Sequence, residues 1–316
     1  MIKYVGGELL PDFLKKILFI THSGEGHADD VLAAAIFEMA MCRTTDIIVI
    51  RTRDPEIIKK GDVVVDVGGG ELDHHGENFH ETRESGEGYA SAGIIWNLYG
   101  NYAIRNVATR EKFFISGNQI MEINKKIDRE VILPVDMDDT GEKKQQHMFS
   151  FVKYFMPTWL DDEQDYDRAF WKAENLSYKI LYHVIKEKIV EAISIKLMDF
   201  TKVTDGILEI HSQNFPWKEN VLEYNKINPE KQVRFVVFKY TDGTSWAAQA
   251  VPPSMEREFE QLIPFPEKWG GKTDQKLAEL CDVPDAIMCH KGLFFARAKS
   301  KEGILEMCKI AQGIAD

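Results

Sequence analysis

Short apolar runs alternate with helical patterns through the first part of the chain. Runs rich in β-branched residues predict buried strands at 17–20, 46–50 and 62–67. The stretches between them favour helices at 31–42 and 56–60. Strands that alternate with helices are typical of a parallel α/β sheet with right-handed crossovers. Residues 1–16 form a lead-in, for which we expect an edge strand or a strand and turn, with a short helix that begins at Pro11-Asp12.

Helical patterns continue beyond the third predicted strand. They cover 89–100, 111–130, 149–155 and 165–200. Within this region the apolar run 131–135 predicts one more strand, which ends at Asp136. The small residues Ser91 and Gly93 lie at the start of the 89–100 helix, where they would permit either close packing or the close approach of a phosphate to the helix N-terminus.

The pattern changes near 201–206, where we place a domain boundary. Beyond it, short strands are predicted at 207–210, 221–224, 233–240, 245–251, 286–290 and 292–298. An Asp-Gly turn at 241–244 predicts a hairpin, and helices are predicted at 274–281 and 301–311. The expected fold class is therefore α/β, with a parallel-sheet domain over 1–200 and a smaller, mostly antiparallel α+β domain over 201–316.

Composition narrows the class of protein. The chain has 316 residues and a formal net charge of −12, which argues against a broad duplex-DNA surface because such surfaces are basic. No apolar run reaches the roughly 18 residues that cross a membrane, and no secretory signal is evident. We therefore expect a cytoplasmic protein whose four cysteines are reduced, and a metal site at Cys289-His290 is disfavoured because no second close pair accompanies it.

The candidate chemistry gathers where two of the predicted strands end. The first strand leads into Thr21-His22-Ser23-Gly24-Glu25-Gly26-His27-Ala28-Asp29-Asp30, and the third leads into Asp66, three glycines and Asp73-His74-His75. Ligands bind at the carboxyl ends of parallel strands, so both loops are candidates for one site. Their imidazoles and carboxylates suit manganese, iron or zinc, and they are numerous enough for a two-metal centre.

These motifs resemble the DHH phosphoesterase superfamily and, within it, the Myg family, whose members have been called protein hydrolases and RNA exonucleases. The similar segments are the loop from Thr21 to Asp30, Asp66 to His75, Ser91-Ala92-Gly93, and Val135-Asp136 with Asp139. Further likeness around Trp217, Trp246 and Trp269 extends the resemblance over nearly the whole chain. His27 stands where the wider superfamily has an acid, and the superfamily's usual C-terminal glycine-rich motif is not evident. The substrate class therefore does not follow from other branches.

The resemblance implies a pair of divalent metal ions, manganese first, with magnesium or zinc as alternatives. His22, His27 and Asp29 would bind the ions, Asp66 would bridge them, and His74 and Asp136 would complete the coordination. Asp138 and Asp139 are alternatives to Asp136, which we favour because it ends a predicted strand. For Asp30, we prefer a helix cap to a ligand role.

The positions and chemistry of further residues suggest roles around the metal ions. His75 is expected to act catalytically on the substrate phosphate, and Asp73 to orient a histidine, with a simple turn-forming role as its alternative. Ser91 and Gly93 would approach the substrate from the first domain. Trp269, His290, Lys291 and Arg297 would line a substrate cleft from the second.

The motifs alone predict hydrolysis of a phosphoester or phosphoanhydride, and the resemblance implies a metal-dependent exonuclease that hydrolyses phosphodiester bonds of RNA or a short oligonucleotide. One alternative is a small-molecule phosphohydrolase that acts on pyrophosphate, a cyclic dinucleotide or a nucleotide. Another is a metal-binding regulatory protein without catalysis. A peptidase is disfavoured because no His-Glu-x-x-His helix is present. The sequence leaves a homo-oligomer open.

Overall fold

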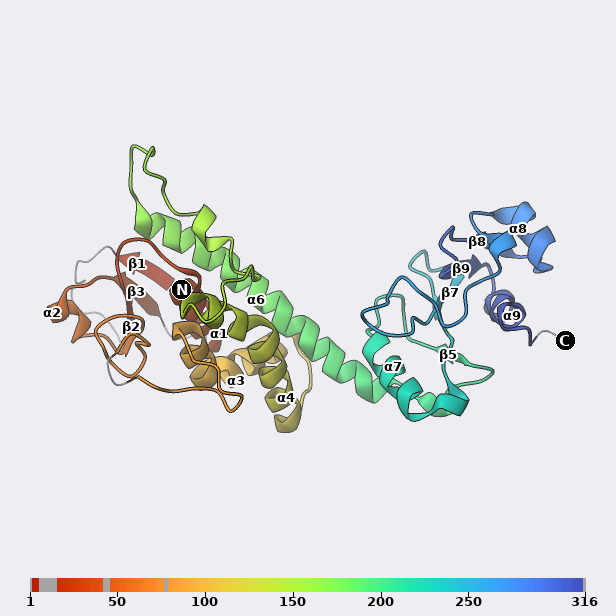
Figure 1. Cartoon of the computed structure of the whole chain (residues 1–316), viewed down its shortest axis with the longest axis horizontal. Helices are drawn as coiled ribbons and strands as arrows, with labels where there is room; N and C mark the ends of the chain where they lie inside the picture. The colour runs from red at the N-terminus through yellow and green to blue at the C-terminus, as the bar shows by residue number, and fades with distance from the viewer. Residues whose placement is uncertain (1, 6–15, 42–45, 77–78, 315–316) are drawn as a thin grey trace. The chain divides into compact units, whose positions relative to one another are not determined.

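The computed structural model describes residues 2–5, 16–41, 46–76 and 79–314, and it divides into two compact units, Met1–Ile189 and Val190–Asp316 (Figure 1). The division falls inside the long helix α6 (Tyr166–Leu197). The expected α/β fold class is confirmed, since a parallel sheet is followed by a second, mixed sheet. The expected helix start at Pro11-Asp12 lies outside the described residues, as does Cys42.

The first unit holds a four-stranded parallel sheet in the order β1-β3-β2-β4. Its strands are β1 (Ile2–Val5), β2 (Ile17–Thr21), β3 (Ile47–Arg51) and β4 (Val63–Val64). β4 is shorter than predicted because Asp66 has a φ of 58°, which ends the extended backbone. Besides α6, the first unit contains the helices α1 (Ala28–Ala40), α2 (Pro55–Ile58), α3 (Ser91–Glu111), α4 (Gly117–Ile127), η1 (Asp128–Ile132), α5 (Leu133–Asp139) and η2 (Val152–Tyr154).

Alternate residues of β2 face opposite sides of this sheet. Phe19 packs against Phe37 of α1, with ring centroids 5.3 Å apart. Ile20 belongs to the cluster on the other side, where Ile57 and Ile58 of α2 cover the sheet. Both faces are therefore apolar, as parallel sheets require.

The predicted strand at 131–135 was wrong, because this run lies in η1 and α5. Val131 and Val135 are buried at a spacing of four residues, which is a helical face. A run of five apolar residues fits a buried strand and a buried helix equally well. Pro134 is tolerated because it occupies the first turn of α5.

The second unit holds a five-stranded sheet in the order β5-β6-β7-β9-β8. β5 pairs with β6 in parallel, whereas the other pairs are antiparallel. The predicted hairpin is confirmed, since Lys239 pairs with Trp246 across its turn. The strands are β5 (Ile207–Glu209), β6 (Phe235–Lys239), β7 (Trp246–Ala250), β8 (Ala286–Cys289) and β9 (Phe295–Ala298).

Helices cover both faces of this second sheet. Phe235 and Val237 of β6 face a core shared with α8 (Asp274–Cys281) and α9 (Lys301–Gln312). Val236 and Phe238 face the opposite core, which contains Val221 of α7 (Lys218–Ile227). The short helices are η3 (Phe200–Lys202), η4 (Pro229–Lys231) and η5 (Glu267–Trp269).

The predicted strand at 221–224 was also wrong, because it lies inside α7. Val221 and Asn225 are buried one helical turn apart, and this pattern needs a longer window than four residues to be recognised. Among the described residues, no helix combines the length and apolarity needed to span a bilayer.

Candidate metal centre

The candidate site lies at the carboxyl edge of the parallel sheet. β2 and β4 are neighbours, and Ile20 pairs with Val64. His22 follows β2 directly and Asp66 follows β4 closely, so both side chains emerge at the same edge. His22 Nε2 lies 3.4 Å from Asp66 Oδ2. The parallel register thus unites loops that are distant in sequence.

Asp66 is the residue on which the loops converge. Its Oδ1 lies 3.3 Å from His74 Nδ1 and 3.5 Å from His75 Nε2, while its Oδ2 faces His22. The side chain is buried, and the left-handed backbone at φ 58° turns the chain into the glycine loop. Gly68 and Gly69 continue this turn with φ values of 85° and 71°. One buried carboxylate therefore contacts three imidazoles.

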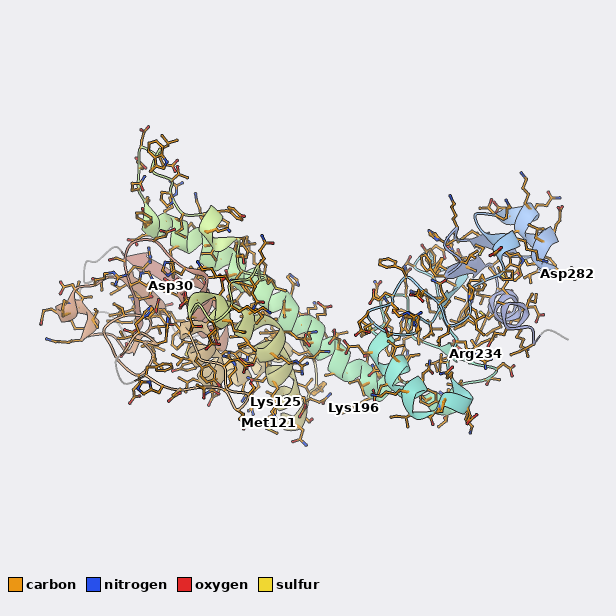
Figure 2. The ribbon with its side chains drawn as sticks, viewed as in Figure 1. Asp30, Met121, Lys125, Lys196, Arg234 and Asp282 are labelled. Carbon is orange, nitrogen blue, oxygen red and sulfur yellow. The ribbon has the colours of Figure 1, made fainter. Side chains whose placement is uncertain are left out.

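The first turn of α1 supplies two further acids. Asp30, labelled in Figure 2, has its Oδ1 at 2.7 Å from the backbone N–H of His27, which it caps. Its Oδ2 lies 3.2 Å from His22 Nε2, so the same side chain joins the cluster. Asp29 is 1% exposed and forms a group with His27 and Asp139 in which ligand atoms lie within 4.8 Å of one another.

Of the three acids considered at the end of α5, Asp139 lies beside His74. Asp139 Oδ2 lies 3.0 Å from His74 Nε2. Asp136 faces away from the histidines: it accepts hydrogen bonds from Arg83 Nη2 at 2.7 Å and from the backbone N–H of Gly93 at 3.0 Å. Burial raises the pKa of Asp136 to about 7, although Arg83 lowers it. Asp136 and Asp139 therefore contact different groups.

The buried polar atoms of this cluster fit a cation. Within the described residues, His22 Nε2, His74 Nε2, Asp66 Oδ1 and Asp30 Oδ2 lie close to groups of the cluster but make no hydrogen bond, and neither does either carboxylate oxygen of Asp29. Buried polar atoms are normally paired, since leaving them unpaired costs about 1–3 kcal/mol each. Imidazole nitrogen together with carboxylate oxygen is a donor set that manganese, iron and zinc accept. These residues could therefore hold metal.

Protons balance part of the negative charge when no metal is bound. Burial lowers the pKa of His22, but its contacts with Asp30 and Asp66 outweigh this and raise it to about 10. Burial also lowers the pKa of His74, but its contacts with Asp139 and Asp66 outweigh this and raise that pKa to about 10. Burial raises the pKa of Asp29 well above its ordinary value, and nearby Asp66 adds to the effect. The pKa of Asp66 is lowered by His22 and His74 despite its burial.

Metal affinity is expected to increase from about pH 6 to about pH 9, since imidazole must lose its proton before it binds metal. His22 and His74 keep their protons up to about pH 10 in the metal-free chain. Each displaced proton should give about a tenfold gain in affinity per pH unit over this range. Calorimetric titration with manganese, in buffers of different ionisation enthalpy, counts the protons released. A His74→Gln variant should release fewer; affinity independent of pH would contradict the expectation.

The remaining first-unit residues named from the sequence support the loops. Asp73 accepts hydrogen bonds from the backbone N–H groups of Gly69, at 2.7 Å, and His75, at 3.1 Å, so it holds the glycine loop in shape. Ser91 Oγ lies 3.1 Å from His74 Nδ1 and is buried. Gly93 is packed against Asp136 and Arg83. His75 is different, because 67% of its side chain is exposed.

Of the four second-unit candidates, two are buried or held by other side chains, and two are exposed. Trp269 is fully buried and packs against Phe265, so its side chain has no exposed surface for a substrate. Arg297 stacks over Tyr240 and pairs with Asp242, which ties it to the β6–β7 hairpin. His290 and Lys291 are exposed in the turn before β9.

Two buried arginines support the residues of the centre. Neither was identified as a site residue from the sequence. Arg51 ends β3 and donates through Nη2 to the Gly24 carbonyl at 2.7 Å, while its Nη1 pairs with Asp167 at 3.0 Å. Arg83 holds Asp136 and also pairs with Asp128 at 2.8 Å. The sequence signal that could have identified Arg51 is its position directly after a run of β-branched residues. No local pattern marked Arg83, because its partners lie far along the chain.

Asp139→Asn is expected to weaken manganese binding at least tenfold, whereas Asp136→Asn is expected to leave it within about threefold. Asp139 contacts His74 and belongs to the group with His27 and Asp29. Asp136 contacts Arg83 and Gly93 instead. Calorimetric titration of both variants at one pH compares the two acids directly. The reverse order of effects would restore Asp136 as the ligand.

Comparison with known proteins identifies relatives over most of the chain. The MYG1 exonuclease family model, described as an uncharacterised protein family (UPF0160), matches residues 18–311. The MYG1 protein C694.04c of Schizosaccharomyces pombe is 28% identical, with 92% of this chain and 96% of the relative covered. The MYG1 exonuclease of Homo sapiens is 27% identical, with 92% and 84% covered. A MYG1 protein of Chlamydia trachomatis is 25% identical, with 90% and 93% covered.

Proposed function

This chain belongs to the MYG1 exonuclease family, and on that premise we propose that it is a divalent-metal-dependent phosphodiesterase that removes nucleotides from one end of an RNA strand or short oligonucleotide. The observation that carries the proposal is the cluster of unpartnered buried nitrogen and oxygen atoms around Asp66. The exonuclease name of the human relative supports the reaction class. The RNA substrate and the number of ions belong to the proposal.

Two sets of residues with no member in common would hold two ions, with manganese as the first choice. One set is His22, Asp30 and Asp66, and the other is His27, Asp29 and Asp139. His74 lies between Asp66 and Asp139 and would complete the coordination. When bound, such ions supply Lewis-acid stabilisation of the phosphoryl group and lower the pKa of water at the site.

The protein residues divide the remaining tasks by their exposure. Asp29, Asp30 and Asp66 form a buried floor that excludes bulk water and repels phosphate until cations neutralise it. His27 and His75 are exposed above this floor. His75 keeps one edge on Asp66 and offers its open surface to the substrate, where an imidazole can donate a hydrogen bond to a phosphate oxygen. Ser91 and Asp73 fix the orientation of the adjacent loop.

The proposal is tested by removing metal and restoring manganese, magnesium, zinc or buffer alone in the presence of end-labelled oligoribonucleotides. Labels at the 5′ end and at the 3′ end reveal the direction of shortening, and Asp29→Asn serves as the inactive control. A metal-dependent ladder that is absent in the variant supports an exonuclease. Phosphate release from pyrophosphate, or cleavage of a cyclic dinucleotide, without any ladder would replace it with a small-molecule phosphohydrolase. Ion binding without turnover of any substrate would favour a regulatory role.

A further inference from the structure

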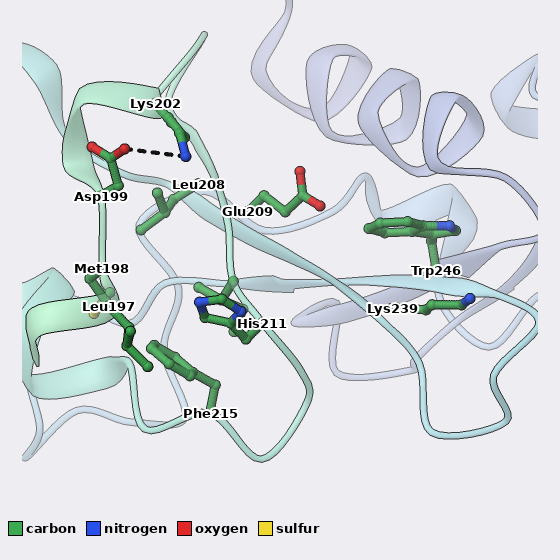
Figure 3. Close-up of a pocket in the computed structure, with 11 residues that line it drawn as sticks. Leu197, Met198, Asp199, Lys202, Leu208, Glu209, His211, Phe215, Lys239 and Trp246 are labelled. Atoms are coloured by element: carbon green, nitrogen blue, oxygen red, sulfur yellow. Dashed lines mark ion pairs between the residues drawn. The ribbon is translucent and has the colours of Figure 1, made fainter. Parts of the chain in front are cut away.

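A second recessed site lies in the second unit, on elements that carry none of the candidate metal ligands. It has a volume of about 350 Å³ and is formed by the end of α6, the η3 segment, β5 and its following loop, and the facing ends of β6 and β7 (Figure 3). Its lining combines aromatic rings with charged groups, namely His211, Phe215, Trp246, Lys202, Lys239 and Glu209. The pocket is thus not merely a gap between apolar core residues.

Aromatic rings line the pocket from two parts of the unit. His211 and Phe215, from the loop after β5, lie with ring centroids 5.4 Å apart. Trp246 begins β7 and is only partly buried, and Figure 3 shows its indole ring apart from those two rings across the pocket. Planar rings that keep exposed surface are what a nucleobase uses for stacking.

The described lining holds two lysines and two acids, and one of its lysines is left without an ion pair because Lys301, outside the lining, pairs with Glu209. Asp199 pairs with Lys202 at 3.3 Å, and Glu209 pairs with Lys301 at 2.6 Å. Lys239 makes no ion pair within the described part of the chain, and its side chain is exposed. It sits directly opposite Trp246 in the β6–β7 register, so both side chains stand on the same face of the sheet. The register thus puts a lysine without an ion pair on the Trp246 side of the sheet, although the chain carries a net charge of −12. The cation over the Trp246 ring itself is Lys301, whose Nζ lies 5.4 Å from the ring centroid.

We propose that this pocket binds a nucleotide of a single-stranded RNA, with the base against the aromatic rings and the phosphate at Lys239. The identity of the ligand rests on the proposed function, whereas the pocket itself does not. Stacking surfaces beside a spare cation match a base joined to a phosphate. An acidic peptide would use the lysine but would leave the aromatic surfaces without a matching group.

The test measures RNA binding without catalysis. Fluorescein-labelled hexauridylate is titrated with full-length protein in EDTA and followed by fluorescence anisotropy. Trp246→Leu is expected to weaken binding at least about fivefold, since stacking on an aromatic ring contributes this much or more per base. Lys239→Glu should also weaken binding and lower the slope of log affinity against log salt by about 0.7, as expected for one lost phosphate contact. Lys276→Glu, an exposed lysine of α8, is the matched charge control.

A gain-of-affinity variant separates ligand contact from structural damage. Glu209→Gln removes a negative charge from the lining and releases Lys301, so it should tighten RNA binding, whereas a loss of local structure would weaken it. Photo-crosslinking with a 4-thiouridine oligonucleotide should label a peptide that contains Trp246 or His211.

Each outcome decides between the two proposals. Wild-type-like affinity of both Trp246→Leu and Lys239→Glu, crosslinks confined to other peptides, or no RNA binding by the native chain would overturn the pocket assignment. Equal losses in Lys239→Glu and Lys276→Glu would reduce it to non-specific charge attraction. If the pocket variants lose RNA binding but no substrate is cut with any metal, the exonuclease proposal fails and the pocket assignment stands.

Discussion

Asp66→Asn is expected to abolish metal-dependent hydrolysis, with a rate loss of at least about a thousandfold. This loss corresponds to about 4 kcal/mol of transition-state stabilisation, which is the scale of metal-ion catalysis. Asp66 contacts His22, His74 and His75, so no other side chain of the cluster can replace its charge at that point. The amide keeps the size of the carboxylate but lacks its negative charge.

The fold should survive this change. The backbone of Asp66 is left-handed, and asparagine adopts that conformation nearly as readily as aspartate. Rates on a labelled oligoribonucleotide and manganese affinity should both collapse, while the circular dichroism spectrum stays that of the native chain. Asp54→Asn is the matched control, because asparagine caps α2 as well as the native aspartate does. Native rates in Asp66→Asn would exclude this cluster as the catalytic centre.

Gly93→Ala is expected to destabilise the first unit by about 3 kcal/mol or more. A Cβ atom at this position would lie 1.9 Å from Asp136 Oδ2 and 2.9 Å from Arg83 Nη2. The carboxylate has little freedom to move, because Arg83 and the Gly93 backbone hold it from two sides. The methyl group must therefore displace a buried ion pair or the start of α3.

Urea denaturation measures this effect as a lower transition midpoint at an unchanged slope. Gly117→Ala is the control, since a Cβ there meets nothing within 4 Å and lies in the first turn of a helix. Its stability should match or slightly exceed that of the native chain. An unfolding midpoint of Gly93→Ala equal to that of Gly117→Ala would show that the Arg83–Asp136 pair yields freely.

The sequence predicted those parts of the site that depend on patterns among neighbouring residues. Apolar runs that end in glycine-punctuated loops mark β2 and β4, and their parallel pairing brings His22 beside Asp66. The turn at the glycines could also be predicted from the sequence, since Gly68 and Gly69 adopt positive φ values, which favour glycine.

The remaining features depend on contacts between distant segments. Taking 131–135 as a strand favoured Asp136 because it would stand at the strand end, whereas the helix α5 sends Asp136 to Arg83 and Asp139 to His74. Arg83 pairs with acids more than forty residues away, and no periodicity encodes such a pairing. The incorrect strand at 131–135 was thus the ground on which Asp136 was favoured over Asp139.

The left-handed backbone at Asp66 also narrows the evolutionary routes open to this position. β-Branched and bulky side chains are costly in this conformation, which leaves glycine and asparagine as the inexpensive replacements. Each is one base change from an aspartate codon, and neither carries the charge that the three histidines contact. A gene duplicate could therefore shed the chemistry in a single step while its product stayed folded and abundant. Glycine or asparagine at this position would mark such a descendant.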